Sequence, residues 1–186
     1  MKVYTRKGDD GSTGLLYGGR IPKDAPGPTA YGSTDEAVSA LGLARPECEP
    51  GGELNELLIR VQRELFVVGA ELATAPDNRH KLTAGTTLVT EEMVTALELI
   101  IDDITARFEP PTEFALPGEN RVAAALDLAR TIVRRAERES VTATTVGWLE
   151  SGSQVVPYLN RLADLCWTLA RWQEGEFRPA RASTAP

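Results

Sequence analysis

Histidine and cysteine are nearly absent from this sequence. The single histidine, His80, stands in a polar stretch, and the 186 residues include only two cysteines, Cys48 and Cys166. A histidine-based catalytic triad and a metal site built from His or Cys ligands are therefore excluded. Two isolated cysteines are too few for a disulfide framework, so we expect a reducing, cytoplasmic compartment.

Basic charge and long apolar runs are also scarce. The 20 Lys and Arg residues are outnumbered by 27 Asp and Glu, giving a net charge of −7, and nucleic-acid binding is not expected because phosphate contacts need a basic face. No apolar run approaches the ~20 residues of a membrane span, and no signal-peptide core is expected. The remaining balance, 42% hydrophobic and 25% charged, is that of a soluble globular protein. We expect one domain over residues 1–178 and a flexible tail over 179–186.

The sequence opens with a glycine-rich segment that has no helical period. Residues 1–31 predict an ordered loop, with a short strand or turn near residues 15–17. The stretch "TRKGDDGSTG" within it is rich in backbone N–H groups and hydroxyls, with Arg6 and Lys7 alongside. We interpret this segment as a candidate nucleotide-binding loop.

The rest of the chain is helical in pattern. Ser33 and Glu36 have the spacing of a capping box and predict a short helix to about Ala44. Apolar residues at spacings of three and four predict four long helices. These are centred on residues 54–72, 90–108, 120–136 and 159–169. The predicted fold class is all-α, a five-helix antiparallel bundle of four long helices and one short one.

The segment "LARTIVRRAERES", residues 128–140, places like charges side by side on a helix. Arg130 and Arg134 are four residues apart, so their guanidinium groups stack and repel, and Glu137 relieves only part of this. Such a pair on the shoulder of a packing face suits an anion, because guanidinium forks match phosphate oxygens. The alternative is that both arginines are solvated or pair with carboxylates of a neighbouring helix.

The glycine-rich loop has the chemistry of a phosphate site without a standard fingerprint. Glycines let backbone N–H groups approach a ligand, Ser12 and Thr13 add hydroxyls, and Asp9 or Asp10 could hold a hydrated Mg²⁺. An ordinary glycine-rich turn is the alternative. Two aromatic residues elsewhere in the chain, Phe114 and Trp167, fit either the core or a ligand contact.

Six segments occur in an order that points to a known family. They are "YTRKGDDGSTGL", "AYGSTDEAVSALG", "QRELFVVGAELAT", "FALPG", "ARTIVRRAER" and "YLNRLADLCWTLAR". Together they resemble the successive motifs of the PduO-type ATP:cob(I)alamin adenosyltransferases, from about Tyr4 to Arg171. The resemblance implies a five-helix bundle that assembles as a homotrimer with ATP at each subunit interface. The implied reaction is attack by the cobalt of cob(I)alamin on the 5′-carbon of ATP, giving adenosylcobalamin and triphosphate.

The resemblance also assigns roles to residues. It implies that Asp35, Arg130 and Arg134 are catalytic, with Asp35 and Arg130 forming an ion pair between subunits. It places Phe114 and Trp167 under the corrin ring, where apolar bulk keeps the lower cobalt ligand off. Mg²⁺ is expected on the ATP phosphates, with no direct His or Cys ligand. The implied ATP-binding residues are Thr5, Arg6, Gly8, Asp9, Gly11, Ser12, Thr13, Lys23, Arg134, Arg135, Glu137, Arg138 and Asn160.

Several positions depart from the family pattern, mainly on the side that would face the corrinoid. They are Gly27, Val38, Glu119, Asp127, Ala163 and Trp167. The family has a histidine at the position of Asp127 and a glycine at the position of Glu119. The changes at Val38, Glu119 and Asp127 motivate an alternative, a diverged paralogue that binds ATP or a corrinoid without adenosyl transfer, as a carrier or regulatory partner. A purely structural helical oligomer is a third possibility, disfavoured by the intact "RRAER" and "TRKGDDGSTG" segments.

Overall fold

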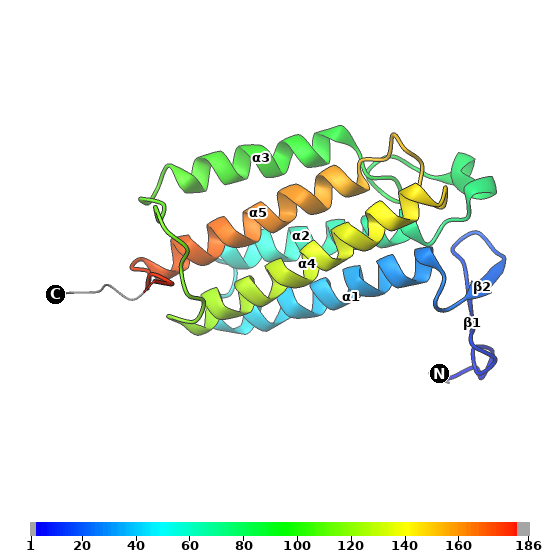
Figure 1. Ribbon diagram of the computed structural model, residues 1–186, viewed down its shortest axis with the longest axis horizontal. Coiled ribbons are helices and arrows are strands. Elements are labelled where there is room, and N and C mark those ends of the chain that lie inside the picture. The colour runs from blue at the N-terminus through cyan, green and yellow to red at the C-terminus, as the bar shows by residue number, and fades with distance from the viewer. Residues whose placement is uncertain (1–2, 182–186) are drawn as a thin grey trace.

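Five α-helices make up most of the part of the chain described by the computed structural model, residues 3–181 (Figure 1). Their bounds are α1 Pro26–Ala44, α2 Glu53–Leu72, α3 Glu91–Thr105, α4 Arg121–Thr145 and α5 Val155–Glu174, with 3₁₀ turns η1 Arg45–Glu47 and η2 Pro76–Lys81. The prediction of a mainly helical fold with five helices is confirmed. None of the helices in this range is both long and apolar enough to cross a membrane.

The apolar residues that recur at spacings of three and four along each helix, here called its seam, form the core as the sequence predicts. On α2, the seam residues from Leu54 to Leu72 are all buried, and Leu58, Val68 and Leu72 have no exposed surface. Burying a leucine side chain is worth about 1.5–3 kcal/mol, so one such seam supplies most of the reason for this helix to form. The buried apolar side chains of all five helices join in one cluster.

The helices alternate in direction along the chain, but one neighbouring pair runs parallel. In Figure 1, α5 lies between α3 and α4, and α1 packs beside α4 and α2. Consecutive helices run in opposite directions, as predicted. Because α4 separates α3 from α5 in the sequence, these two neighbours run the same way.

The first helix is not short, which corrects the prediction. It begins at Pro26 and spans 19 residues, so the N-terminal segment ends at Ala25 instead of residue 31. Proline fits the first helical turn, whose N–H groups have no intrahelical partner, and here "PGP" starts the helix instead of breaking it. The proposed cap Ser33 lies inside the helix, buried, and its hydroxyl donates to Glu139 on α4.

The fourth helix is longer than its sequence indicates. The sequence predicts a helix centred on residues 120–136 followed by a looser stretch from about Val141, yet α4 continues to Thr145. Hydroxyls of Thr142 and Thr144 donate to the carbonyls four residues earlier, at 3.2 and 2.9 Å, and Ala143 is fully buried. Packing therefore overrides a weak helical propensity. At the other end Asn120 caps the helix as predicted, accepting from the Ala123 N–H at 2.8 Å.

The N-terminal segment forms a small hairpin at one end of the bundle (Figure 1). Strands β1 Ser12–Gly14 and β2 Arg20–Pro22 pair antiparallel. The predicted turn around residues 15–17 lies in the connection between them, where Gly18 and Gly19 take positive φ angles of 93° and 90°. The Leu16 N–H donates to the Ala73 carbonyl at 3.0 Å, which fastens the hairpin to the end of α2. Of the predicted tail, residues 182–186 lie outside the described residues.

Candidate functional site

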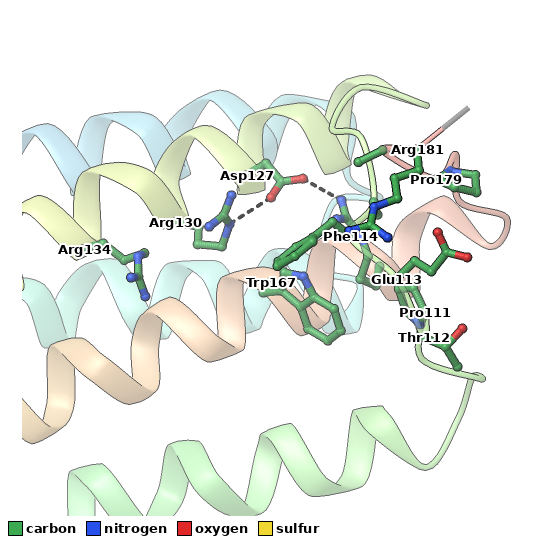
Figure 2. A pocket seen from close by; sticks show the side chains of 13 residues that line it. Pro111, Thr112, Glu113, Phe114, Asp127, Arg130, Arg134, Trp167, Pro179 and Arg181 are labelled. Carbon is green, nitrogen blue, oxygen red and sulfur yellow. Dashed lines mark hydrogen bonds and ion pairs between the residues drawn. The ribbon is translucent and has the colours of Figure 1, made fainter. Parts of the chain in front are cut away.

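A cavity of about 1220 Å³ opens beside α4, at the end of the bundle away from the hairpin (Figures 1 and 2). Asp127, Arg130 and Arg134 line one wall because spacings of three and four residues put them on one face of α4. Trp167 and Arg171, one turn apart on α5, line the adjacent wall. The site combines charged and aromatic groups from two packed helices, so its walls are rigid.

The remaining walls come from two irregular segments. The loop before α4 contributes Phe114, whose side chain is 89% exposed, and the C-terminal segment contributes Pro179 to Arg181. These segments run side by side, because Leu116 donates to the Arg178 carbonyl at 2.8 Å and Ala180 to the Phe114 carbonyl at 2.7 Å. An aromatic ring so exposed at a cavity is available to a ligand, which argues against the core alternative for Phe114.

Two of the charged residues at the cavity wall, Asp127 and Arg171, are buried. Asp127 accepts from Arg130 Nε at 2.9 Å and from Arg171 Nη2 at 2.5 Å, as the dashed lines in Figure 2 mark. Arg171 also contacts Glu174, at 2.9 Å through Nη2 and 2.8 Å through Nε. Burial raises the pKa of Glu174, and the Arg171 guanidinium beside it opposes that rise. The cluster holds two positive and two negative groups.

The other residues of the "RRAER" segment have distinct surroundings. Arg134 and Arg138 are exposed, and Arg138 Nη1 donates to the Arg134 carbonyl at 3.0 Å. Glu137 accepts from Asn160 Nδ2 on α5 at 2.9 Å, so these two predicted nucleotide contacts are brought together. Arg135 faces α1, where it pairs with Glu36 and donates to Ser33 Oγ at 3.3 Å.

The N-terminal loop is held in a defined shape. Asp10 Oδ1 accepts from the Ser12 N–H at 2.9 Å and from its hydroxyl at 2.8 Å, and these bonds, with Arg20 nearby, lower the pKa of Asp10. The Lys23 N–H donates to the Gly11 carbonyl at 2.9 Å. The Lys23 ammonium lies over Gly8, 3.2 Å from where a Cβ there would stand. The loop and its lysine are thus brought together, with backbone groups left at the surface.

Arg20 is a residue of this loop that the sequence interpretation missed. Its Nε donates to Ser12 Oγ at 2.9 Å, and its Nη2 donates to the Ser12 carbonyl at 3.2 Å and to the Lys7 carbonyl. Arg171 and Arg181 at the cavity were missed in the same way. Arg20 and Arg181 lie outside the quoted motifs, and Arg171 is the last residue of "YLNRLADLCWTLAR". No local signal in the sequence distinguishes any of the three from a solvated side chain.

Within one chain the loop and the arginine wall are not brought together. The hairpin lies at one end of the bundle (Figure 1). The loop before α4 and the C-terminal segment, which line the cavity, lie at the other end. Asp35 is exposed on α1, while Arg130 pairs with Asp127 of its own helix. Asp35 instead borders an apolar groove of about 490 Å³ between α1 and α2 that includes Val38 and Phe66, the latter 65% exposed.

The unusual residues at 119 and 167 also have defined places. Glu119 pairs with Arg178 at 3.1 Å and so helps to fasten the C-terminal segment to the loop before α4. Trp167 is half-buried at the cavity wall. Among residues 3–181, no three His, Cys, Asp or Glu side chains gather in a way that could hold a metal ion.

Comparisons with known proteins point to one family. A family model described as cobalamin adenosyltransferase matches residues 3–173. Corrinoid adenosyltransferases from Citrobacter freundii and Bacillus subtilis are 39% and 42% identical to the chain, covering 93% and 92% of it and 95% and 86% of their own lengths. A variant PduO-type ATP:corrinoid adenosyltransferase from Lactobacillus reuteri, solved with cobalamin and ATP, superimposes with a TM-score of 0.84 at 30% identity, over 97% of this chain and 100% of that one.

Proposed function

The chain belongs to the cobalamin adenosyltransferase family, and from this we infer that it transfers the 5′-deoxyadenosyl group of ATP to the cobalt of cob(I)alamin. The observation that carries this function is the cavity at which guanidinium groups share one site with two aromatic rings, the exposed Phe114 and the half-buried Trp167. A polyanionic nucleotide suits the first kind of group, and the broad face of a corrin ring suits the second.

In this reaction the cobalt–carbon bond forms as the bond from C5′ to the triphosphate oxygen breaks, and the electron pair leaves with the triphosphate. The step needs no proton transfer at carbon, which fits a site without histidine. What the chain must supply is positioning and positive charge for the leaving group. We assign the charge to Arg134, Arg138 and Lys23, with Glu137 and Asn160 as further nucleotide contacts.

The glycine-rich loop is the proposed triphosphate site. Gly8, Gly11, Ser12 and Thr13 would offer N–H groups and hydroxyls, and Thr5, Arg6 and Asp9 border them. Mg²⁺ on the phosphates would add positive charge there. Asp9 could contact the ion through water, because Asp10 is already engaged by Ser12. A metal carried mainly by phosphate oxygens also fits a chain whose described residues offer no cluster of three ligands.

Phe114 and Trp167 are the proposed corrinoid contacts. Phe114 is exposed on an irregular loop and Trp167 is fixed on α5, so one ring can move while the other forms a wall. Apolar side chains at this place would exclude water and leave no donor for the lower face of the cobalt. That arrangement favours the reduced cobalt that the reaction needs.

We propose that the complete site forms between copies of the chain in a homotrimer. This is supported by the separation of loop and cavity within one chain, and by the apolar groove that leaves Phe66 exposed. A second copy could bring its loop to the arginine wall and its Asp35 to Arg130. The cytoplasm is the proposed compartment, since Cys48 and Cys166 are free thiols.

The carrier alternative is not favoured, because the relatives are named as transferases. Two of the residues that motivated it, Glu119 and Asp127, also form ion pairs within the chain. No observation supports the structural oligomer.

Adenosyl transfer is tested by mixing the protein with ATP, Mg²⁺ and chemically reduced cobalamin. We expect the absorbance change of adenosylcobalamin formation and release of one triphosphate per turnover, both abolished by EDTA. ATP binding by calorimetry without any turnover would instead support the carrier alternative.

The intersubunit site is tested by complementation. Arg134→Ala and Lys23→Ala chains should each be inactive as homo-oligomers. If the two residues of one site come from different chains, refolding the variants together in equal amounts restores about a quarter of the sites of a random trimer. No recovery from mixed trimers, verified by differently tagged chains, would place both residues in the site of one chain.

A further inference from the structure

We propose that Asp127 is a positioning residue that, held by Arg171, fixes the Arg130 guanidinium at the wall of the cavity. This rests on the function proposed above, in which Arg130 belongs to the reaction site. It gives a role to a position where the family resemblance expects histidine.

The two oxygens of Asp127 have separate partners. Oδ1 accepts from Arg130 Nε at 2.9 Å and Oδ2 accepts from Arg171 Nη2 at 2.5 Å. The Asp127 side chain is only 4% exposed and that of Arg171 only 3%, so water cannot readily replace either bond. Arg171 is in turn held by Glu174. The carboxylate is therefore held in place by a second, buried guanidinium group.

Of the two arginines of this cluster, both at the cavity wall, Arg130 has the more accessible side chain. Arg130 has 28% of its side chain exposed and lines the cavity, as Figure 2 shows. Its bond to Asp127 uses Nε, and within residues 3–181 no hydrogen bond engages its two Nη groups. These groups are free to bind an anionic substrate group or a carboxylate of a second copy, in a direction already set before binding.

A histidine could not make this arrangement. A neutral imidazole has one acceptor nitrogen, whereas Asp127 accepts from two arginines at once, and an imidazolium ion accepts from neither. The carboxylate also offsets one of two neighbouring guanidinium charges. The aspartate and the arginine behind it therefore work as a unit that a histidine at 127 would break.

The experiment is a double-mutant cycle on adenosyl transfer. Asp127→Asn keeps the size of the side chain but has one acceptor oxygen, so one arginine loses its bond. We expect kcat to fall about tenfold, with the KM for ATP changed less than about twofold. In an Arg130→Ala background the same substitution should change kcat less than about twofold, because the group it positions is gone.

Two comparisons separate positioning from stability. Glu64→Gln is the matched control, since Glu64 accepts from Arg60 and from buried Tyr158 but does not line the cavity. It should lower the melting temperature without lowering kcat. In the second, Asp127→Asn is combined with Arg171→Gln and Glu174→Gln. This triple variant removes all three buried charges of the cluster and should recover stability, while kcat stays low.

The results distinguish the inference from its premise. Recovery of kcat together with stability in the triple variant, or an equal effect of Asp127→Asn with and without Arg130, would overturn the positioning role. Wild-type kcat in Arg130→Ala would remove Arg130 from the site, and the inference with it. An inactive wild-type protein would refute the proposed function itself.

Discussion

Replacing Gly27 by alanine should destabilise the protein, although alanine is the better helix former. A Cβ added at Gly27 would stand 2.3 Å from Nε1 and 2.5 Å from Cε2 of Trp148. Contacts this short do not occur between real atoms, so the indole or the start of α1 must move. The indole is not free to move without loss, because its N–H donates to the Leu72 carbonyl at 2.8 Å.

The expected loss of stability in Gly27→Ala follows from three effects. Inserting a methyl group into a packed contact costs about 1–3 kcal/mol, and losing the indole hydrogen bond about 1 kcal/mol. The gain in helix propensity is at most about 1 kcal/mol and is smaller in a first turn. The net loss is therefore about 1–3 kcal/mol, or about 2–12 °C in melting temperature for a chain of this size.

Thermal denaturation followed by circular dichroism, at one fixed protein concentration, measures this change. Gly42→Ala, in the same helix, is the control, because its Cβ would lie 3.4 Å from the flexible end of Gln62. It should leave the melting temperature unchanged or slightly raised. In a Trp148→Leu background Gly27→Ala should cost nothing. Unchanged stability of Gly27→Ala in the wild-type background would refute the packing argument.

Three further predictions concern the site and the core. Arg134→Ala should weaken ATP binding about tenfold or more, since a charge-assisted bond is lost. Its melting temperature should change little because this side chain is exposed. An ATP affinity equal to that of the wild type, measured by calorimetry, would exclude a phosphate role for Arg134. Phe114→Ala should raise the KM for cobalamin while leaving stability unchanged, since the ring is 89% exposed, and an unchanged KM would remove it from the corrinoid site. Burial raises the pKa of the Cys166 thiol to about 12, so only about 10⁻⁴ of it is thiolate at pH 8 and a thiol reagent should modify it only after unfolding. Because the folded pKa exceeds the ordinary value of 9.0, the stability from this buried neutral thiol is present below pH 9 and is lost as the pH rises toward 12; rapid labelling of Cys166 in the folded protein would contradict this.

The sequence predicts helices well where the signal is local. The seam from Leu54 to Leu72 and the cap at Asn120 depend on residues within one helix, and both are confirmed. The errors arise where distant contacts outweigh local preference. The start of α1 at Pro26 and the extension of α4 to Thr145 depend on packing between α1 and α4, which no local window contains.

The candidate site shows the same division. Arg130 and Arg134 are four residues apart in the sequence, so their position on one face of a helix could be predicted. Asp127 and Arg171 come together only because α4 packs on α5, and nothing in the sequence around either residue indicates the other. A residue that departs from a family pattern can thus have its compensating partner on another helix.

The parallel course of α3 and α5 has a consequence for the cavity. Because α3 and α4 lie on opposite sides of α5, the segment from residue 106 to 120 has to pass across the end of α5 to join them (Figure 1). Asn120 ties its far end to the Gln173 carbonyl at 2.8 Å. This connecting segment therefore forms the mouth of the cavity. The order of the helices sets its minimum length, but its residues contribute little to the core. Its composition can vary to admit different ring systems while the five helices stay as they are, whereas deletions within it would strain the bundle.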